Sequence, residues 1–156
     1  MENKLVSGSI VASVIGAAML VLSSCGQGRN ITIEGDVPSD VTGKVYLQKF
    51  ENKLFVDVDS AEIVNGTFRF TEQVQLPELY GLTLSKNDTP YYIFLEEGSV
   101  KVHLDPERGY ANSTTQGSAL QDEFTAYQQT DEDINIEEYL KAHPTSHVAN
   151  YVFYRN

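Results

Sequence analysis

The sequence predicts a mainly β protein: an antiparallel β-sandwich or barrel of seven to eight strands, followed by two to three C-terminal α-helices. Three observations predict this fold class. Short runs of alternating apolar and polar residues fill the chain from about residue 30 to residue 117. Closely spaced turn signals separate these runs. After Gly117 the apolar spacing changes from that of strands to that of helices.

The first runs each have one apolar face that can enter a core. Ile31 and Ile33 share a face in NITIEG, and Val45 and Leu47 point inward from KVYLQKF. In KLFVDVD the alternation separates two sets of side chains: Leu54, Val56 and Val58 on one side, and Phe55, Asp57 and Asp59 on the other. These runs therefore predict half-buried strands.

Two hairpins are expected next. Asn65-Gly66 in AEIVNGTFRF is a two-residue turn signal, because a type I′ turn needs positive φ at both positions. Phe68 and Phe70 then share a face, and LYGLTLS aligns Tyr80, Leu82 and Leu84. YYIFLEEGSVKVHLD predicts a second hairpin around Glu97-Gly98. Its first arm is apolar on both faces, which predicts a central strand with its aromatic residues in the core rather than on a ligand surface.

A first helix is predicted just after Gly117. Ser118 is a candidate N-cap, with Gln121 at the matching capping-box position. The apolar residues that follow at helical spacing are Leu120, Phe124 and Tyr127.

Two more helices are predicted towards the C-terminus. One begins near Asn135 and ends at Pro144, and another starts near Ser146 and runs to Asn156. The last residues are apolar and carry no stop signal, so we expect this chain to be the front part of a longer one.

The N-terminus is predicted to be a lipoprotein signal peptide that spans residues 1–24. Lys4 precedes an apolar run from Ile10 to Val21, which is short for a membrane span. The next residues, Leu22, Ser23 and Ser24, resemble a bacterial lipobox because small residues precede the cysteine. Cleavage before Cys25 would leave its thiol to carry the lipid, and several acyl chains hold a protein firmly on a membrane.

Three other interpretations of this segment remain open: an uncleaved membrane anchor, an ordinary signal peptide with a chance cysteine, and a free reactive thiol at Cys25. The lipoprotein interpretation is favoured because the one cysteine of the chain falls where the apolar run ends. No neighbouring residue would lower the pKa of a reactive thiol there. Residues 25–29 are expected to form a short Gly-rich tether.

The charge of the chain excludes some partners. The formal net charge is −11, and removal of residues 1–24 takes away Glu2 and Lys4, so this value does not change. Such an acidic protein is poorly suited to nucleic acid or to anionic lipid headgroups. Membrane contact is therefore expected through the lipid anchor alone.

Five segments resemble a known family in order and content: KVYL, DSAEIVNGTFRF, PELYGLTL, FLEEGSVKVHLD and QGSALQDEF. They resemble domain-of-unknown-function family 4369 over roughly residues 30 to 125. The resemblance implies the N-terminal module of Bacteroidetes lipoproteins whose second domain is a thioredoxin-like disulfide reductase. EEYLKAHPTSHVANYVF resembles the helical connector that leads into that second domain.

The chain departs from that larger architecture because it contains no Cys-x-x-Cys. The reductase activity is therefore not expected here. The tether also lacks the acidic run associated with surface export in some of these lipoproteins. We therefore expect the protein on the periplasmic side of the envelope, at the outer membrane.

No catalytic or metal site and no cofactor are expected. Pro144 separates His143 from His147, and the acidic residues do not follow the order of a calcium loop. Glu96 and Glu97 are explained as turn residues, and His103 is placed on the outward face of its strand. No Gly-x-Ser-x-Gly or P-loop motif is present, so a hydrolase, the third hypothesis, has no supporting feature.

The sequence thus predicts four segments: a signal peptide (1–24), a tether (25–29), an antiparallel β domain (30–117) and a helical connector (118–156) that precedes a missing second domain. The expected function is a non-catalytic docking or spacing module for a thioredoxin-like domain or another periplasmic protein. The alternative is a standalone lipoprotein that binds a glycan or a peptide.

Overall fold

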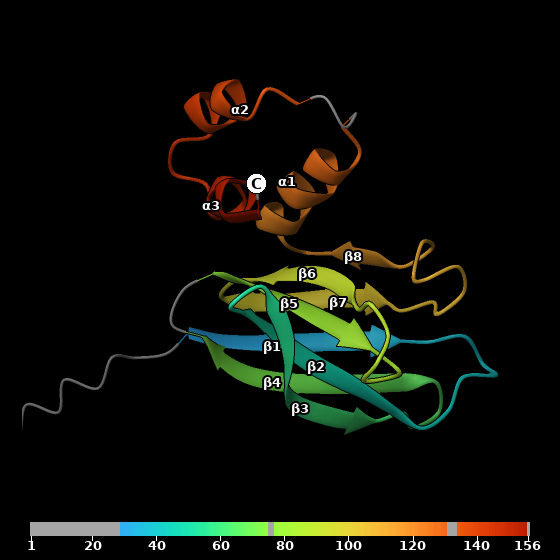
Figure 1. The fold of residues 1–156 in the computed structure, drawn as a ribbon. Helices are drawn as coiled ribbons and strands as arrows, with labels where there is room; N and C mark the ends of the chain where they lie inside the picture. Colours follow the sequence, from blue (N-terminus) through green and yellow to red (C-terminus); the bar gives the residue numbers. More distant parts are fainter. Residues whose placement is uncertain (1–28, 75–76, 131–133, 156) are drawn as a thin grey trace, which may run out of the picture.

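A computed structural model describes residues 29–74, 77–130 and 134–155. Within these ranges eight strands come first and three helices follow (Figure 1). The strands are β1 (Arg29–Asp36), β2 (Lys44–Glu51), β3 (Leu54–Glu62), β4 (Thr67–Val74), β5 (Glu78–Thr83), β6 (Tyr91–Leu95), β7 (Gly98–His103) and β8 (Thr114–Gln116). The helices are α1 (Ala119–Gln128), α2 (Ile136–Ala142) and α3 (His147–Arg155).

The strands form two four-stranded sheets packed as a sandwich, which confirms the predicted fold class. Sheet A has the strand order β4-β1-β7-β8, and sheet B has the order β3-β2-β5-β6. All neighbouring strands are antiparallel except β1 and β7, which run parallel. Alternate side chains from both sheets fill the core between them: Ile31, Ile33, Val45, Leu47, Phe68, Phe70, Leu82, Ile93, Val100 and Val102.

In both predicted hairpins the two flanking strands do not pair with each other, so the hairpin predictions are wrong, although the Asn65-Gly66 turn itself is correct. Asn65 and Gly66 have φ values of 53° and 75°, and Val64 and Thr67 exchange backbone hydrogen bonds across them. Beyond this bridge β3 pairs with β2 in sheet B, whereas β4 pairs with β1 in sheet A. β6 and β7 separate into different sheets in the same way. Both connections therefore cross from one sheet to the other at a corner of the sandwich. A turn signal indicates where the chain reverses, but it does not determine which strand pairs with which.

β3 carries a bulge that changes its predicted faces. Gln48 pairs with Asp57 and Leu47 pairs with Asp59, so Val58 is the extra residue. Adjacent residues of β2 point to opposite faces, and Asp57 and Asp59 therefore do so too. The prediction that both carboxylates share one side is wrong for this reason.

β6 is an edge strand and not the central strand predicted from its apolar faces. Ile93 points into the sandwich, while Phe94 packs on the other side against Phe124 of α1, with ring centroids 5.0 Å apart. The helices lie beyond the β6–β8 side of the sandwich (Figure 1) and build a second apolar core with Phe50, Leu79 and Phe94 of sheet B. This second core explains an edge strand that is buried on both faces.

Gln121 of α1 holds this layer to the free edge of β6. Its side chain is only 2% exposed; Oε1 accepts a 2.7 Å hydrogen bond from the Phe94 amide, and Nε2 lies 3.5 Å from the Tyr92 carbonyl oxygen. Ser118 accepts from the Gln121 amide, as predicted for the N-cap. The Gln121 side chain bonds to the strand, however, and does not complete a capping box.

Replacing Gln121 with leucine should destabilise the fold by about 2–3 kcal/mol, because the buried Phe94 amide loses its acceptor. Chemical denaturation monitored by circular dichroism measures this change. Gln128→Leu makes the same substitution at an exposed position of α1 and should change the stability little. Equal stabilities of the two variants would contradict this role of Gln121.

Candidate functional site

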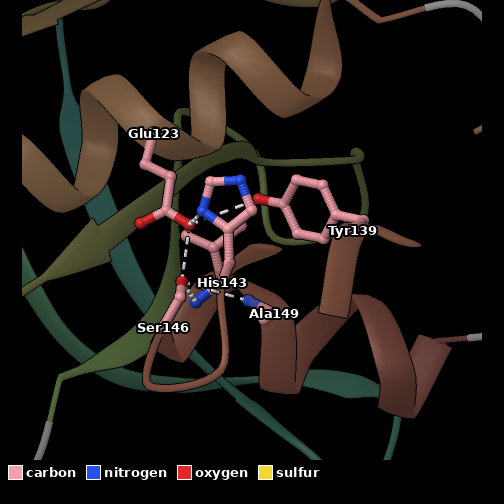
Figure 2. A network of polar contacts seen from close by, with 6 residues as sticks. Glu123, Tyr139, His143, Ser146 and Ala149 are labelled. Atoms are coloured by element: carbon pink, nitrogen blue, oxygen red, sulfur yellow. Dashed lines mark hydrogen bonds and ion pairs between the residues drawn. The ribbon is translucent and has the colours of Figure 1, made fainter. Parts of the chain in front are cut away.

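Four chemically competent side chains meet where the three helices converge (Figure 2). Glu123 projects from α1, and Tyr139 comes from α2. His143 is the C-cap of α2, and Ser146 immediately precedes α3. A carboxylate, a phenol, an imidazole and a hydroxyl thus lie together, and these are groups that enzymes use for acid–base and nucleophilic catalysis.

One carboxylate oxygen of Glu123 contacts the side chains of all three other residues. Oε1 accepts hydrogen bonds from Ser146 Oγ at 2.6 Å and from Tyr139 Oη at 3.2 Å, and His143 Nδ1 lies 3.4 Å away (Figure 2). The His143 ring stacks on the Tyr139 ring with centroids 4.5 Å apart. Glu123 therefore links α1 to the end of α2 and the start of α3.

The arrangement of Ser146 is that of a helix cap and not of a nucleophile. Its hydroxyl accepts hydrogen bonds from the amides of Val148 and Ala149, and it donates its own proton to Glu123. In a serine–histidine–acid triad the histidine lies between the other two residues. Here the carboxylate contacts both the serine and the histidine, so the cluster works as a clasp between helices.

The clasp changes the ionisation of Tyr139. Burial, which is the largest cause, raises the pKa of this phenol together with the charge of Glu123 and the hydrogen bond that the hydroxyl donates to it, from 10.0 to about 12 in total. The raised pKa means that the neutral phenol is the form the fold stabilises. This contribution to stability is complete below pH 10 and is lost as the pH rises towards 12.

A groove lies on the other side of α3, between this helix and the ends of β2 and β5. Its volume is about 500 Å³. Leu79 and Phe94 contribute apolar surface, and the rings of Phe50 and Tyr151 meet edge to face with centroids 5.9 Å apart. Lys49 lies at the groove and is paired with Glu78 at 2.9 Å and Glu51 at 3.3 Å. The groove therefore offers aromatic surface beside charges that already balance one another.

The predicted lipidation and cleavage residues, Leu22, Ser23, Ser24 and Cys25, lie outside the described residues. His103 makes an exposed contact to Asp36. His143 belongs to the clasp described above, and His147 is the first residue of α3. Across the described ranges, no three His, Cys, Asp or Glu side chains group so that they could hold a metal ion.

Sequence reasoning missed the residues of the clasp and one more acid. Glu96 was explained as a turn residue, yet it accepts hydrogen bonds from the Ser118 hydroxyl at 2.7 Å and the Leu120 amide at 3.2 Å. It thereby binds the start of α1 to the end of β6. Ser146, which stands three residues before Ala149, is the one member of the clasp with a local signal, that of an N-cap.

Residue-resolved nuclear magnetic resonance titration of Tyr139 should show that this phenol ionises near pH 12 in the folded protein. Glu123→Gln should lower the pKa of Tyr139 but leave it above 10, because burial acts without the carboxylate. Glu137→Gln removes a carboxylate of α2 that pairs only with Lys141 and should not move it. A Tyr139 pKa that stays unchanged in Glu123→Gln would contradict the clasp.

Comparison with known proteins adds one family. No curated protein matches the chain. None of the helices in the described segments is long and apolar enough to cross a bilayer.

The family model described as "Domain of unknown function (DUF4369)" matches residues 31–124, which is more than half of the chain and covers the sandwich with the first part of α1. The chain therefore belongs to the DUF4369 family.

Proposed function

We propose that this protein is a lipid-anchored, non-catalytic β-domain on the periplasmic side of the cell envelope, at the outer membrane. It positions a partner as a docking or spacing module. The partner class is a thioredoxin-like domain or another periplasmic protein, as in the disulfide reductase lipoproteins whose N-terminal part the chain resembles.

The observation that carries this proposal is the short distance along the chain between the lipobox-like residues and the sandwich. Leu22-Ser23-Ser24-Cys25 is followed by β1 at Arg29. A lipid on Cys25 would hold the sandwich within a few residues of the membrane, since each residue spans at most about 3.6 Å. Membership of the DUF4369 family supports a module that accompanies other domains.

The C-terminal helices support the docking role. α2 and α3 follow the part of the chain that the family model matches. On α3 the side chains of Phe153 and Tyr154 are 69% and 49% exposed. Exposed aromatic residues of this size are typical of surfaces that bind another protein. The clasp supports the non-catalytic role, because Ser146 is used as a helix cap.

Cys25→Ser should release the protein from membranes and abolish incorporation of labelled palmitate, because the acceptor sulfur is lost. Membrane fractionation and palmitate labelling in a Gram-negative host measure both effects. Ser24→Ala keeps a small residue beside the cysteine and should be processed normally. If Cys25→Ser still incorporated palmitate and sedimented with membranes, the lipid anchor would be wrong.

The groove favours a second candidate function, the binding of a glycan or a peptide. It presents Tyr151 and Tyr154 beside apolar and charged side chains, and aromatic faces of this kind stack on sugars or side chains.

Nuclear magnetic resonance titration with a chitin oligomer and with an aromatic tripeptide tests this function. Tyr154→Ala should weaken binding of the active probe about tenfold. Phe153→Ala, on the same helix but outside the groove, should not. Absence of shifts at groove residues with both probes would contradict it.

A further inference from the structure

The two lateral edges of the sandwich differ in whether a helix covers them. At one edge α1 contacts both β6 and β8: Gln121 of α1 accepts a hydrogen bond from the Phe94 amide of β6, and Glu96, just after β6, accepts one from the Leu120 amide of α1. The opposite edge is formed by β3 and β4, and most of it lies away from the helices (Figure 1), although Lys53, just before β3, lies 5.3 Å from the centroid of the Tyr154 ring of α3. None of the described helices covers that edge. An uncovered sheet edge offers unpaired backbone groups to another strand.

β3 is the more exposed strand of this uncovered edge. It is nine residues long and pairs only with β2 among the described strands. The side chains of Leu54, Val56 and Val58 are 67%, 48% and 49% exposed. Soluble proteins often protect such edges with lysine or proline, and β3 contains neither. β4, by contrast, exposes polar side chains such as Arg69, which pairs with Glu34.

Two uncompensated acids lie beside these aliphatic residues. The bulge turns Asp59 towards the interior side of β3, where it meets Glu72 of β4. Burial and the neighbouring Asp59 raise the pKa of Glu72. Asp57 and Glu62 are paired with Lys86 and Lys44, whereas no cation of the described residues pairs with Asp59 or Glu72. A basic side chain from outside would relieve this repulsion.

We propose that the outer edge of β3 is a docking site for a short extended segment of another protein that carries aliphatic side chains and a basic side chain on one face. Leu54, Val56 and Asp59 pair with Glu51, Lys49 and Leu47, which are alternate residues of β2, so their side chains share the interior face of the sheet. The segment adds a strand beside β3 through backbone hydrogen bonds. Its aliphatic side chains pack on Leu54 and Val56, and a basic side chain reaches Asp59 and Glu72. This inference concerns the described residues alone and stands whether or not Cys25 is lipidated.

A second copy of this chain is a poor occupant of the same edge. Antiparallel pairing of two β3 strands about Val58 would place Asp57 opposite Asp59 of the other copy, and like charges directly opposite are destabilising. Each copy also carries a net charge of −11. The bulge at Val58 interrupts regular pairing in the middle of β3, which suits a short segment better than a long sheet.

The test uses the full chain in a non-ionic detergent and a fluorescent peptide in which lysine, valine, valine and lysine occupy alternate positions, separated by threonines. Fluorescence anisotropy should show saturable binding that weakens with salt. Val56→Lys should weaken it about tenfold or more. Val64→Lys adds the same charge at an exposed valine outside β3, so it should change the affinity by less than about twofold. Circular dichroism verifies that both variants are folded.

Three further arms decide the outcome. The same peptide with glutamates in place of the lysines, and the lysine–valine peptide with a central proline, should both bind weakly or not at all. Equal losses in Val56→Lys and Val64→Lys, or unchanged binding of the proline peptide, would show nonspecific charge attraction and overturn the proposal. A dimer that sedimentation detects and Val56→Lys abolishes would show that a second copy occupies the edge, which also overturns it.

Discussion

The fold of this protein depends on how sheet B ends at β6. An edge strand with two apolar faces cannot remain in water, because its backbone and its aromatic side chains would both be exposed. Gln121 supplies the missing acceptor to the Phe94 amide, and the ring of Phe124 covers the ring of Phe94. A single turn of α1 thus satisfies the polar edge and the apolar face together.

The remaining helical features follow from the position of α1. Because α1 lies across β6 and β8, its Glu123 is available to hold the end of α2 and the start of α3. α3 then lies over the ends of β2 and β5, which leaves the aromatic groove between them. The same asymmetry leaves β3 and β4 uncovered on the far side. The β3 proposal therefore concerns a different part of the molecule from the groove, whereas Tyr154 of α3 belongs both to the groove and to the exposed aromatic surface offered for docking.

Local sequence patterns predicted where strands and helices lie better than they predicted which strands pair with one another. Alternation at Ile31, Ile33, Val45 and Leu47 identified buried faces, and Ser118 identified the start of α1. The separation of β3 from β4, and of β6 from β7, depends on contacts with β1, β2 and β5 that no turn residue encodes. Gln121 was assigned to a capping box, and Glu123 looked like an ordinary polar position of a surface helix. Their roles depend on Phe94 and Ser146, which lie over twenty residues away in the chain.

Residue-resolved hydrogen exchange of the full chain tests the central claim that one sandwich edge is sealed and the other is open. The account predicts that the Phe94 amide, bonded to Gln121, exchanges only when the whole protein unfolds. It also predicts that the amides on the outer edge of β3 exchange by local opening, far faster than the Phe94 amide. Equal protection of the two edge strands, or faster exchange at Phe94 than along β3, would contradict it.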